Sequence, residues 1–149
     1  GSGGVTISGF TFPTSDGSNG QFIKTDGAGN LSFASAGATL SHSDLADATT
    51  TVSSSATTTL NTFDKTVYRS AKYFISIVDS TNSRCEIVDA NVTHDGSDAY
   101  VSTFGSTTNY TGGLCVFSAD ISGNDVRLRV TNISDASTVF KFQRIAVDI

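Results

Sequence analysis

Apolar residues are unevenly distributed along this chain of 149 residues. From residue 63 onward, β-branched and aromatic runs alternate with short polar turns, a pattern typical of a β-sheet domain. The alternation is clearest in residues 126–131 (VRLRVT), where the apolar side chains occupy the even positions. The turns delimit six predicted strands, at 66–78, 84–93, 99–104, 114–121, 126–133 and 138–149. We therefore predict an all-β fold with an antiparallel, jelly-roll-like β-sandwich.

The last of these strands predicts one irregularity. Phe140 and Phe142 alternate with polar neighbours, whereas Ile145 and Val147 continue with the opposite parity. Because a strand has a side-chain period of two, this change predicts a β-bulge near residues 143–144.

The N-terminal part has a different pattern. Residues 12–33 read as two copies of a polar unit, each an Asp-Gly turn (16–17 and 26–27) followed by another glycine and a short apolar strand. The few large apolar side chains in this stretch are too few to offset the entropy of ordering so many Gly and Ser residues. We expect an extended, glycine-rich segment, ordered only when a neighbouring domain or identical, intertwined chains complete its core.

Residues 35–62 are rich in Ser and Thr, with single apolar residues at irregular spacing. This spacing fits neither a helix nor a free-standing strand. It predicts one boundary near residue 62, dividing the chain into a repeat-like shaft segment (1–34), a neck or linker (35–62) and a β-sandwich head (63–149).

Charge and composition exclude several classes. The formal net charge is −5 and the basic residues are scattered, which argues against nucleic-acid binding. No apolar run approaches the length of a membrane span, so we expect no membrane insertion. Cys85 and Cys115 lie in predicted strands with apolar neighbours; we expect buried free thiols, with an inter-strand disulfide as the alternative.

Candidate catalytic groups are few. His42 lies in the predicted linker, and His94 directly follows a strand, where capping a hairpin is favoured over acting as a base. Glu86 is the only glutamate, and the aspartates lie mostly in turns or at strand ends. No spacing matches a known calcium or zinc site. From the sequence we expect no catalytic residues, no cofactor and no metal, and therefore no enzymatic activity.

One loop has the composition of a recognition loop. Tyr68, Tyr73 and Tyr100 lie in predicted strands, where aromatic side chains usually pack in the core or across strands. Tyr110 instead lies in the Gly-, Ser-, Thr- and Asn-rich stretch GSTTNYTGG. The candidate receptor-binding residues are Asn109, Tyr110 and Thr111.

Two blocks resemble known modules. Residues 10–33 (FTFPTSDGSNGQFIKTDGAGNLSF) are similar to a short module that recurs in bacteriophage tail-fibre proteins of the marine and cyanobacterial type. The C-terminal runs TVYRSAKYFISI, THDGSDAYVSTFG, FSADISGNDVRLRVTN and TVFKFQRIAVDI together resemble a terminal domain of such virion proteins. The resemblance implies a homotrimer with a distal β-rich tip, located in the virion as a tail or capsid fibre. It carries over no catalytic residues.

Within these blocks, basic residues interrupt the strand patterns. They could form ion pairs with aspartates across strands or chains, or could line a solvated face. The basic residues are Arg69, Lys72, Arg127 and Arg129, and the candidate partners are Asp89, Asp120 and Asp125.

Three functions follow from this interpretation. The favoured one is the distal part of a trimeric phage fibre that contacts other virion proteins and attaches to a glycan or protein receptor on the host surface. The second is a purely architectural trimerisation or attachment module. The third, an enzyme that degrades polysaccharide, is least favoured.

Overall fold

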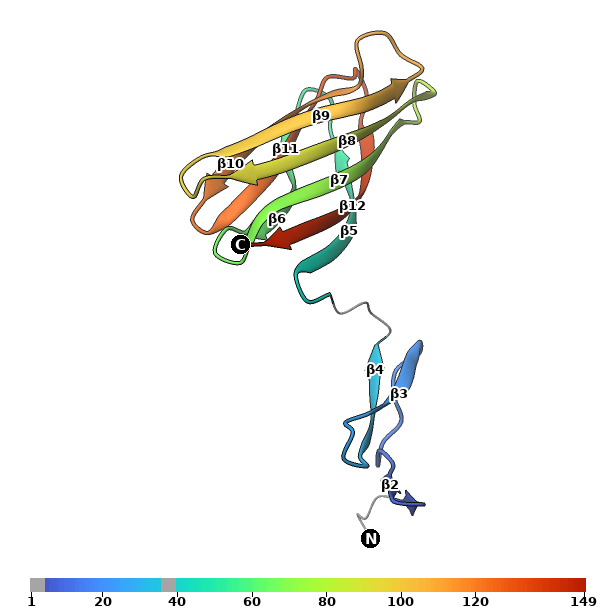
Figure 1. Cartoon of the computed structure of the whole chain (residues 1–149). Helices are drawn as coiled ribbons and strands as arrows, with labels where there is room; N and C mark the ends of the chain where they lie inside the picture. The colour runs from blue at the N-terminus through green and yellow to red at the C-terminus, as the bar shows by residue number, and fades with distance from the viewer. Residues whose placement is uncertain (1–4, 36–39) are drawn as a thin grey trace. The chain divides into compact units, whose positions relative to one another are not determined.

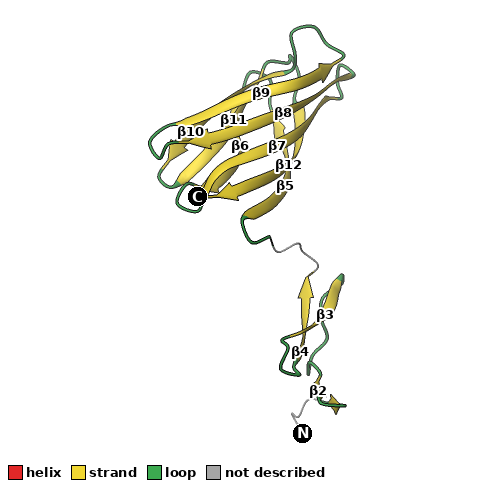
Figure 2. Ribbon diagram, viewed as in Figure 1, coloured by secondary structure: helices red, strands yellow, loops and turns green. Residues whose placement is uncertain are grey.

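The computed structural model describes residues 5–35 and 40–149, and all regular structure in them is β-strand (Figures 1 and 2). Within these ranges there is no helix long and apolar enough to cross a membrane. The chain divides into two compact units, Gly1–Thr39 and Leu40–Ile149.

The N-terminal unit consists of two small hairpins. One pairs β1 (Thr6–Ile7) with β2 (Phe10–Thr11), and the other pairs β3 (Gln21–Thr25) with β4 (Leu31–Ser35). The Thr11 amide donates a 2.8 Å hydrogen bond to the Gly29 carbonyl and so connects the hairpins. No described residue of this unit is buried. Its order therefore does not come from a hydrophobic core within one chain, as the sequence predicts.

The two Asp-Gly turns of this unit are built differently. The Asp26 carboxylate accepts hydrogen bonds from the Asn30 side chain, foremost, and from the Ala28 and Asn30 amides, and these bonds lower its pKa. Gly27 has a φ of 81°, which favours glycine. Gly17 lies outside that region of φ; a Cβ atom there would come within 2.6 Å of the Phe33 ring. The first turn thus needs glycine for space.

The C-terminal unit is a β-sandwich of two antiparallel sheets. The five-stranded sheet has the order β5-β12-β7-β8-β9, and the three-stranded sheet has the order β10-β11-β6. The bounds are β5 Ser43–Val52, β6 Thr57–Asp64, β7 Tyr68–Asp79, β8 Arg84–His94, β9 Ala99–Thr108, β10 Cys115–Ser122, β11 Asp125–Asn132 and β12 Thr138–Asp148. The predicted sandwich and its six strands after residue 66 are confirmed.

The core lies between the two sheets and follows the period of two. In β11, Val126, Leu128 and Val130 are fully buried, as predicted. The facing sheet contributes the inward side chains of β7, β8 and β12. The largest of these are Tyr73, Ile75, Ile77, Val88, Val92, Phe140 and Phe142.

The predicted linker is wrong for most of its length. Within residues 35–62 the chain forms all of β5 and most of β6, so the compact C-terminal unit begins at Leu40. β5 pairs along its length with β12, and β6 pairs with β11. These strands bury few large apolar side chains, among them Val52, Leu60 and Phe63. Hydrogen bonds to strands distant in sequence stabilise β5 and β6, so their own residues carry only a weak apolar pattern.

The predicted bulge at 143–144 is also wrong. β12 pairs with β7 without interruption until the register shifts between Val147 and Asp148. Parity is kept because Arg144 points into the sandwich, only 5% exposed, while Ile145 points outward. The alternation of the strand is kept although it buries a charged residue, because the Arg144 guanidinium forms hydrogen bonds inside the sandwich.

Those partners form an inter-sheet polar cluster of Asp44, Asn61, Tyr73 and Arg144. Arg144 donates to Asn61 Oδ1 (3.0 Å), to the Thr62 carbonyl (2.8 Å) and to Asp44. The Tyr73 hydroxyl donates to the same Asn61 oxygen at 3.0 Å. Burial raises the pKa of Tyr73 to about 12, so the phenol stays neutral.

The cysteines are free, and their positions differ from expectation. Cys85 is exposed at the start of β8, so the expected burial is wrong there. Cys115 is partly buried, and desolvation raises its pKa to about 12. The Cys115 thiol is therefore protonated and weakly nucleophilic at neutral pH.

Candidate functional site

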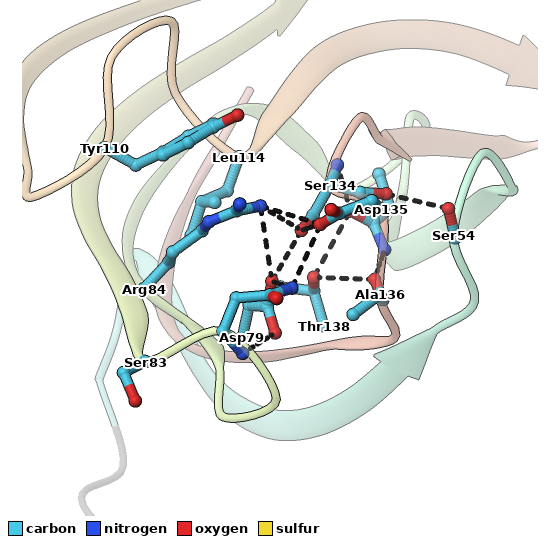
Figure 3. A network of polar contacts seen from close by, with 12 residues as sticks. Ser54, Asp79, Ser83, Arg84, Tyr110, Leu114, Ser134, Asp135, Ala136 and Thr138 are labelled. Atoms are coloured by element: carbon cyan, nitrogen blue, oxygen red, sulfur yellow. Dashed lines mark hydrogen bonds and ion pairs between the residues drawn. The ribbon is translucent and has the colours of Figure 1, made fainter.

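Four connections lie at one end of the sandwich, because antiparallel strands return alternate turns to the same end. They are residues 53–56, 80–83, 109–114 and 133–137, here called the four-loop end. Figure 3 shows the polar network that joins them. On one side of it, the Ser54 hydroxyl donates to the Ser134 carbonyl at 2.8 Å, connecting loops 80 residues apart in sequence.

Asp79 is the buried anchor of this network. Its carboxylate accepts hydrogen bonds from the Ser134 hydroxyl (2.6 Å), the Asn82 side chain (2.8 Å) and the Asn82 amide (3.1 Å). These bonds, the Ser134 bond foremost, lower the pKa of Asp79 below its ordinary value. The carboxylate therefore holds the 80–83 and 133–137 loops together while ionised.

Arg84 extends the network to the surface. Its guanidinium donates to Asp135 at 2.7 Å and lies 3.8 Å from Asp79. The guanidinium carbon is also 4.0 Å from the centre of the Tyr110 ring, within cation–π range. Figure 3 shows the Tyr110 ring above the Arg84 guanidinium and Asp135 to its right. The exposed Tyr110 ring thus contacts a guanidinium whose position is fixed by two aspartates.

Of the other two candidate receptor-binding residues, Asn109 supports the loop and Thr111 lies at its surface. The Asn109 side chain accepts from the Cys85 amide (2.8 Å) and donates to the Ser83 carbonyl (3.0 Å). Both ends of its amide are engaged, so Asn109 positions the loop. Thr111 is exposed beside Tyr110. Contact of any of the three with a receptor stays a prediction.

The base of the Tyr110 loop is fixed by Glu86. Its carboxylate accepts from the Leu114 amide (2.7 Å) and from the Ser106 hydroxyl (2.8 Å). Close behind it, a Cβ atom on Gly113, which has a φ of 76°, would lie 3.3 Å from Glu86. The sole glutamate is therefore used to hold a loop.

Sequence reasoning missed most of this network. Asp79 and Asn82 have the spacing of a side-chain-stabilised turn, a signal that could have identified them. No comparable local signal identified Arg84 or Asp135, because their contact joins residues 51 apart in sequence.

The other candidates are structural in this unit. His94 ends β8, is buried, and its Nε2 lies 2.8 Å from the Tyr68 carbonyl oxygen. Tyr73 is a core residue as expected, whereas Tyr100 is exposed and donates from its hydroxyl to Asp95. His42 is exposed and lies 3.2 Å from Asp148.

Three of the four basic residues form ion pairs with aspartates, the alternative that the sequence left open beside a solvated face. Arg69 instead donates to the His94 carbonyl at 3.2 Å. Lys72 Nζ lies 3.2 Å from Asp89 in the five-stranded sheet. In the other sheet, Arg127 pairs with Asp120 through two hydrogen bonds of 2.6 and 2.7 Å, and Arg129 joins at 3.2 Å. The bond from Arg127 is the main cause of the lowered pKa of Asp120.

No protein-family model and no curated protein matches this sequence. Three solved structures of phage proteins are similar to the chain. The tailspike of Acinetobacter baumannii phage AM24 is 10% identical with a TM-score of 0.47, and the match covers 72% of this chain and 26% of the tailspike. The Acinetobacter phage vB_ApiP_P1 tailspike is 16% identical with a TM-score of 0.39, and the match covers 95% of this chain and 26% of the tailspike.

The third is tailspike gp49 of Acinetobacter baumannii phage Fri1, described as a capsular polysaccharide depolymerase. It is 15% identical with a TM-score of 0.36, over 71% of this chain and 18% of its own. The chain thus spans about a quarter or less of these proteins. Because a depolymerase is an enzyme, this finding contradicts our expectation of no enzymatic activity, which we do not retain.

Proposed function

We propose that this chain is part of a phage tail fibre or tailspike, acts in the virion as a homotrimer, and contacts a receptor on the host-cell surface through the four-loop end. The order of the sequence blocks that resemble phage fibre modules supports the tail assignment. The receptor contact rests chiefly on Tyr110, an exposed ring stacked on Arg84 at the end of a rigid sandwich.

The homotrimer is supported by the N-terminal unit. Its described residues include no buried side chain, while Ile7, Phe10, Phe22 and Ile23 are all close to half exposed or more. Ordered strands that leave their apolar residues in water gain little from the hydrophobic effect. Contact between identical copies would bury these side chains and supply the missing core.

The chemistry of the four-loop end suits a surface glycan. A tyrosine ring offers an apolar face for the C–H groups of a sugar, and its hydroxyl can exchange hydrogen bonds. The largely exposed Asp135 carboxylate pairs with Arg84 and can accept hydrogen bonds from sugar hydroxyls. Because the supporting groups are already paired, little side-chain entropy is lost on binding.

The test uses the full chain and purified host-surface polysaccharide. Tyr110→Ala is expected to weaken binding roughly tenfold, equivalent to about 1.4 kcal/mol, whereas Tyr110→Phe keeps the ring and most of the affinity. Titration calorimetry measures both, and release of reducing ends in the same samples separates cleavage from binding. Wild-type affinity in Tyr110→Ala, with an unchanged unfolding midpoint, would place the receptor contact elsewhere. If the chain bound host cells but not the purified polysaccharide, and protease treatment of the cells abolished that binding, the receptor would be a protein and not a glycan.

The oligomeric state is tested separately. Light scattering of the full chain is expected to give the mass of three copies. The mass of one copy, with the β3–β4 amides still protected from exchange, would refute the homotrimer.

A further inference from the structure

The outer face of the five-stranded sheet has an apolar patch formed by Leu45, Phe74, Ile145 and Val147. Each of these side chains is between 45% and 50% exposed. Leu45 lies directly opposite Ile145 across the β5–β12 pair. Leu45, Phe74 and Ile145 line one hollow of this face, and Ile145 and Val147 line a second. A contiguous group of large apolar side chains on a strand face marks an interaction surface more often than chance exposure.

The lysine at the centre of this face is already paired, whereas Asp47, which lines the first hollow, forms no ion pair among the described residues. Lys72 lies opposite Ile145 in the β12–β7 pair. Its ammonium pairs with Asp89 at 3.2 Å and lies 5.4 Å from the centre of the Phe104 ring. Because the charge is already compensated by these partners, covering the patch would not leave an unpaired lysine.

The opposite outer face differs. On the three-stranded sheet, the outward side chains include Asp120, Arg127 and Arg129, which form the ion-pair network described above. Val116 is the exposed large apolar residue of β10, at 56%. A charged, self-paired face is suited to solvent, so the two faces of the sandwich are built for different surroundings.

We infer that the apolar patch packs against another copy of this chain. This inference rests on the proposed homotrimer and adds which surface of the sandwich the copies share. Five peptide steps separate Ser35 from Leu40, a reach of at most roughly 18 Å. If the N-terminal units of several copies associate, this short connection brings the first strand of each sandwich close to its counterparts.

That first strand is β5, which contributes Leu45 to the patch. It is the outermost strand of its sheet, so the backbone groups along one side have no strand partner in the described residues. A ten-residue unpaired edge is prone to non-specific pairing unless it is covered. Packing between copies would cover the edge and the adjoining apolar side chains together, while leaving the four-loop end free.

Thiol labelling of the full chain tests this inference. In a Cys85→Ser background, which removes the exposed native thiol, Ile145→Cys is compared with Val116→Cys. Both sites are about half exposed in a single chain, so maleimide should label them at similar rates if the patch is not covered by another copy. If copies cover the patch, maleimide should react at position 145 more slowly, by roughly tenfold or more, and dilution to single copies should abolish the difference.

The outcomes separate the two proposals. Equal rates at both positions in a protein with the mass of three copies would overturn the patch as the shared surface and leave the homotrimer standing. A mass of one copy at all concentrations would overturn the homotrimer and, with it, the shared patch.

Discussion

The sandwich and the N-terminal unit are made of the same elements, antiparallel strands joined by polar turns, yet only the sandwich buries side chains. In the sandwich, every second residue of β11 enters a core lined by both sheets. In the N-terminal unit, the strands are two to five residues long and no described residue is buried. The comparison shows that hydrogen-bonded pairing is common to both units, and that burial makes only one of them self-sufficient.

The largest expected effect tests the core of the sandwich. Leu128→Ala removes a fully buried side chain at the centre of β11 and should lower the free energy of unfolding by about 2–5 kcal/mol. Urea unfolding followed by circular dichroism measures the change. The control, Val116→Ala on the exposed face of β10, should change it far less. A loss below that of the control would mean that the sandwich is not held by this core.

The second effect concerns the inter-sheet polar cluster. Arg144→Ala removes the donor to Asn61, Thr62 and Asp44, and should lower the free energy of unfolding by about 2 kcal/mol. Lys141→Ala, an exposed cation three positions earlier in the same strand, is the matched control. Equal stabilities of the two variants would show that the buried guanidinium contributes nothing to joining the sheets.

The third effect tests the independence of the N-terminal unit. Gly17→Ala places a methyl group against the Phe33 ring and should destabilise the β3–β4 hairpin locally by about 1–2 kcal/mol. Hydrogen exchange should then speed up at β3 and β4, while the unfolding midpoint of the sandwich stays the same. Gly20→Ala has open space around its Cβ position but a φ of 86°, so it separates backbone strain from steric clash. A shift of both units together would contradict their independence.

The smallest effect is a pH dependence at the end of the sandwich opposite the four loops. The Asp95 carboxylate accepts hydrogen bonds from the Asp98 amide, the Ser97 amide and the Tyr100 hydroxyl, in order of effect, and these bonds lower its pKa to about 2. Its stabilising contribution is complete above the ordinary pKa of 3.8 and is lost as the pH falls from there towards 2. Unfolding midpoints of wild type and Asp95→Asn should therefore converge over this range. Parallel profiles would show that the turn does not titrate.

Local pattern predicts part of this fold well and part poorly. The six strands after residue 66 follow from period-two alternation and turn residues, and β8 was predicted to within one residue of its ends. β5 and β6 were missed because they are rich in Thr, Ser and Ala and contain few apolar positions to set a period. They are strands because β12 and β11 offer them hydrogen-bond partners from distant parts of the sequence.

The candidate site divides in the same way. Tyr110 was identified from loop composition, but its support by Arg84 depends on a contact between the 109–114 loop and the start of β8. Asn109 was selected for the same composition, and only its hydrogen bonds to residues 83 and 85 show that it positions the loop.

The sequence by itself determined the β class, most strands of the sandwich, and the scarcity of large apolar side chains in the N-terminal segment, because each is recorded in neighbouring residues. Only the tertiary structure decided that Arg144 points inward and Ile145 outward, and which four loops meet at one end. These features depend on strand register and on partners many residues away. The physical reason is that a side chain's orientation is set by the sheet it joins, and burial of a charge is tolerated where distant groups can pair with it.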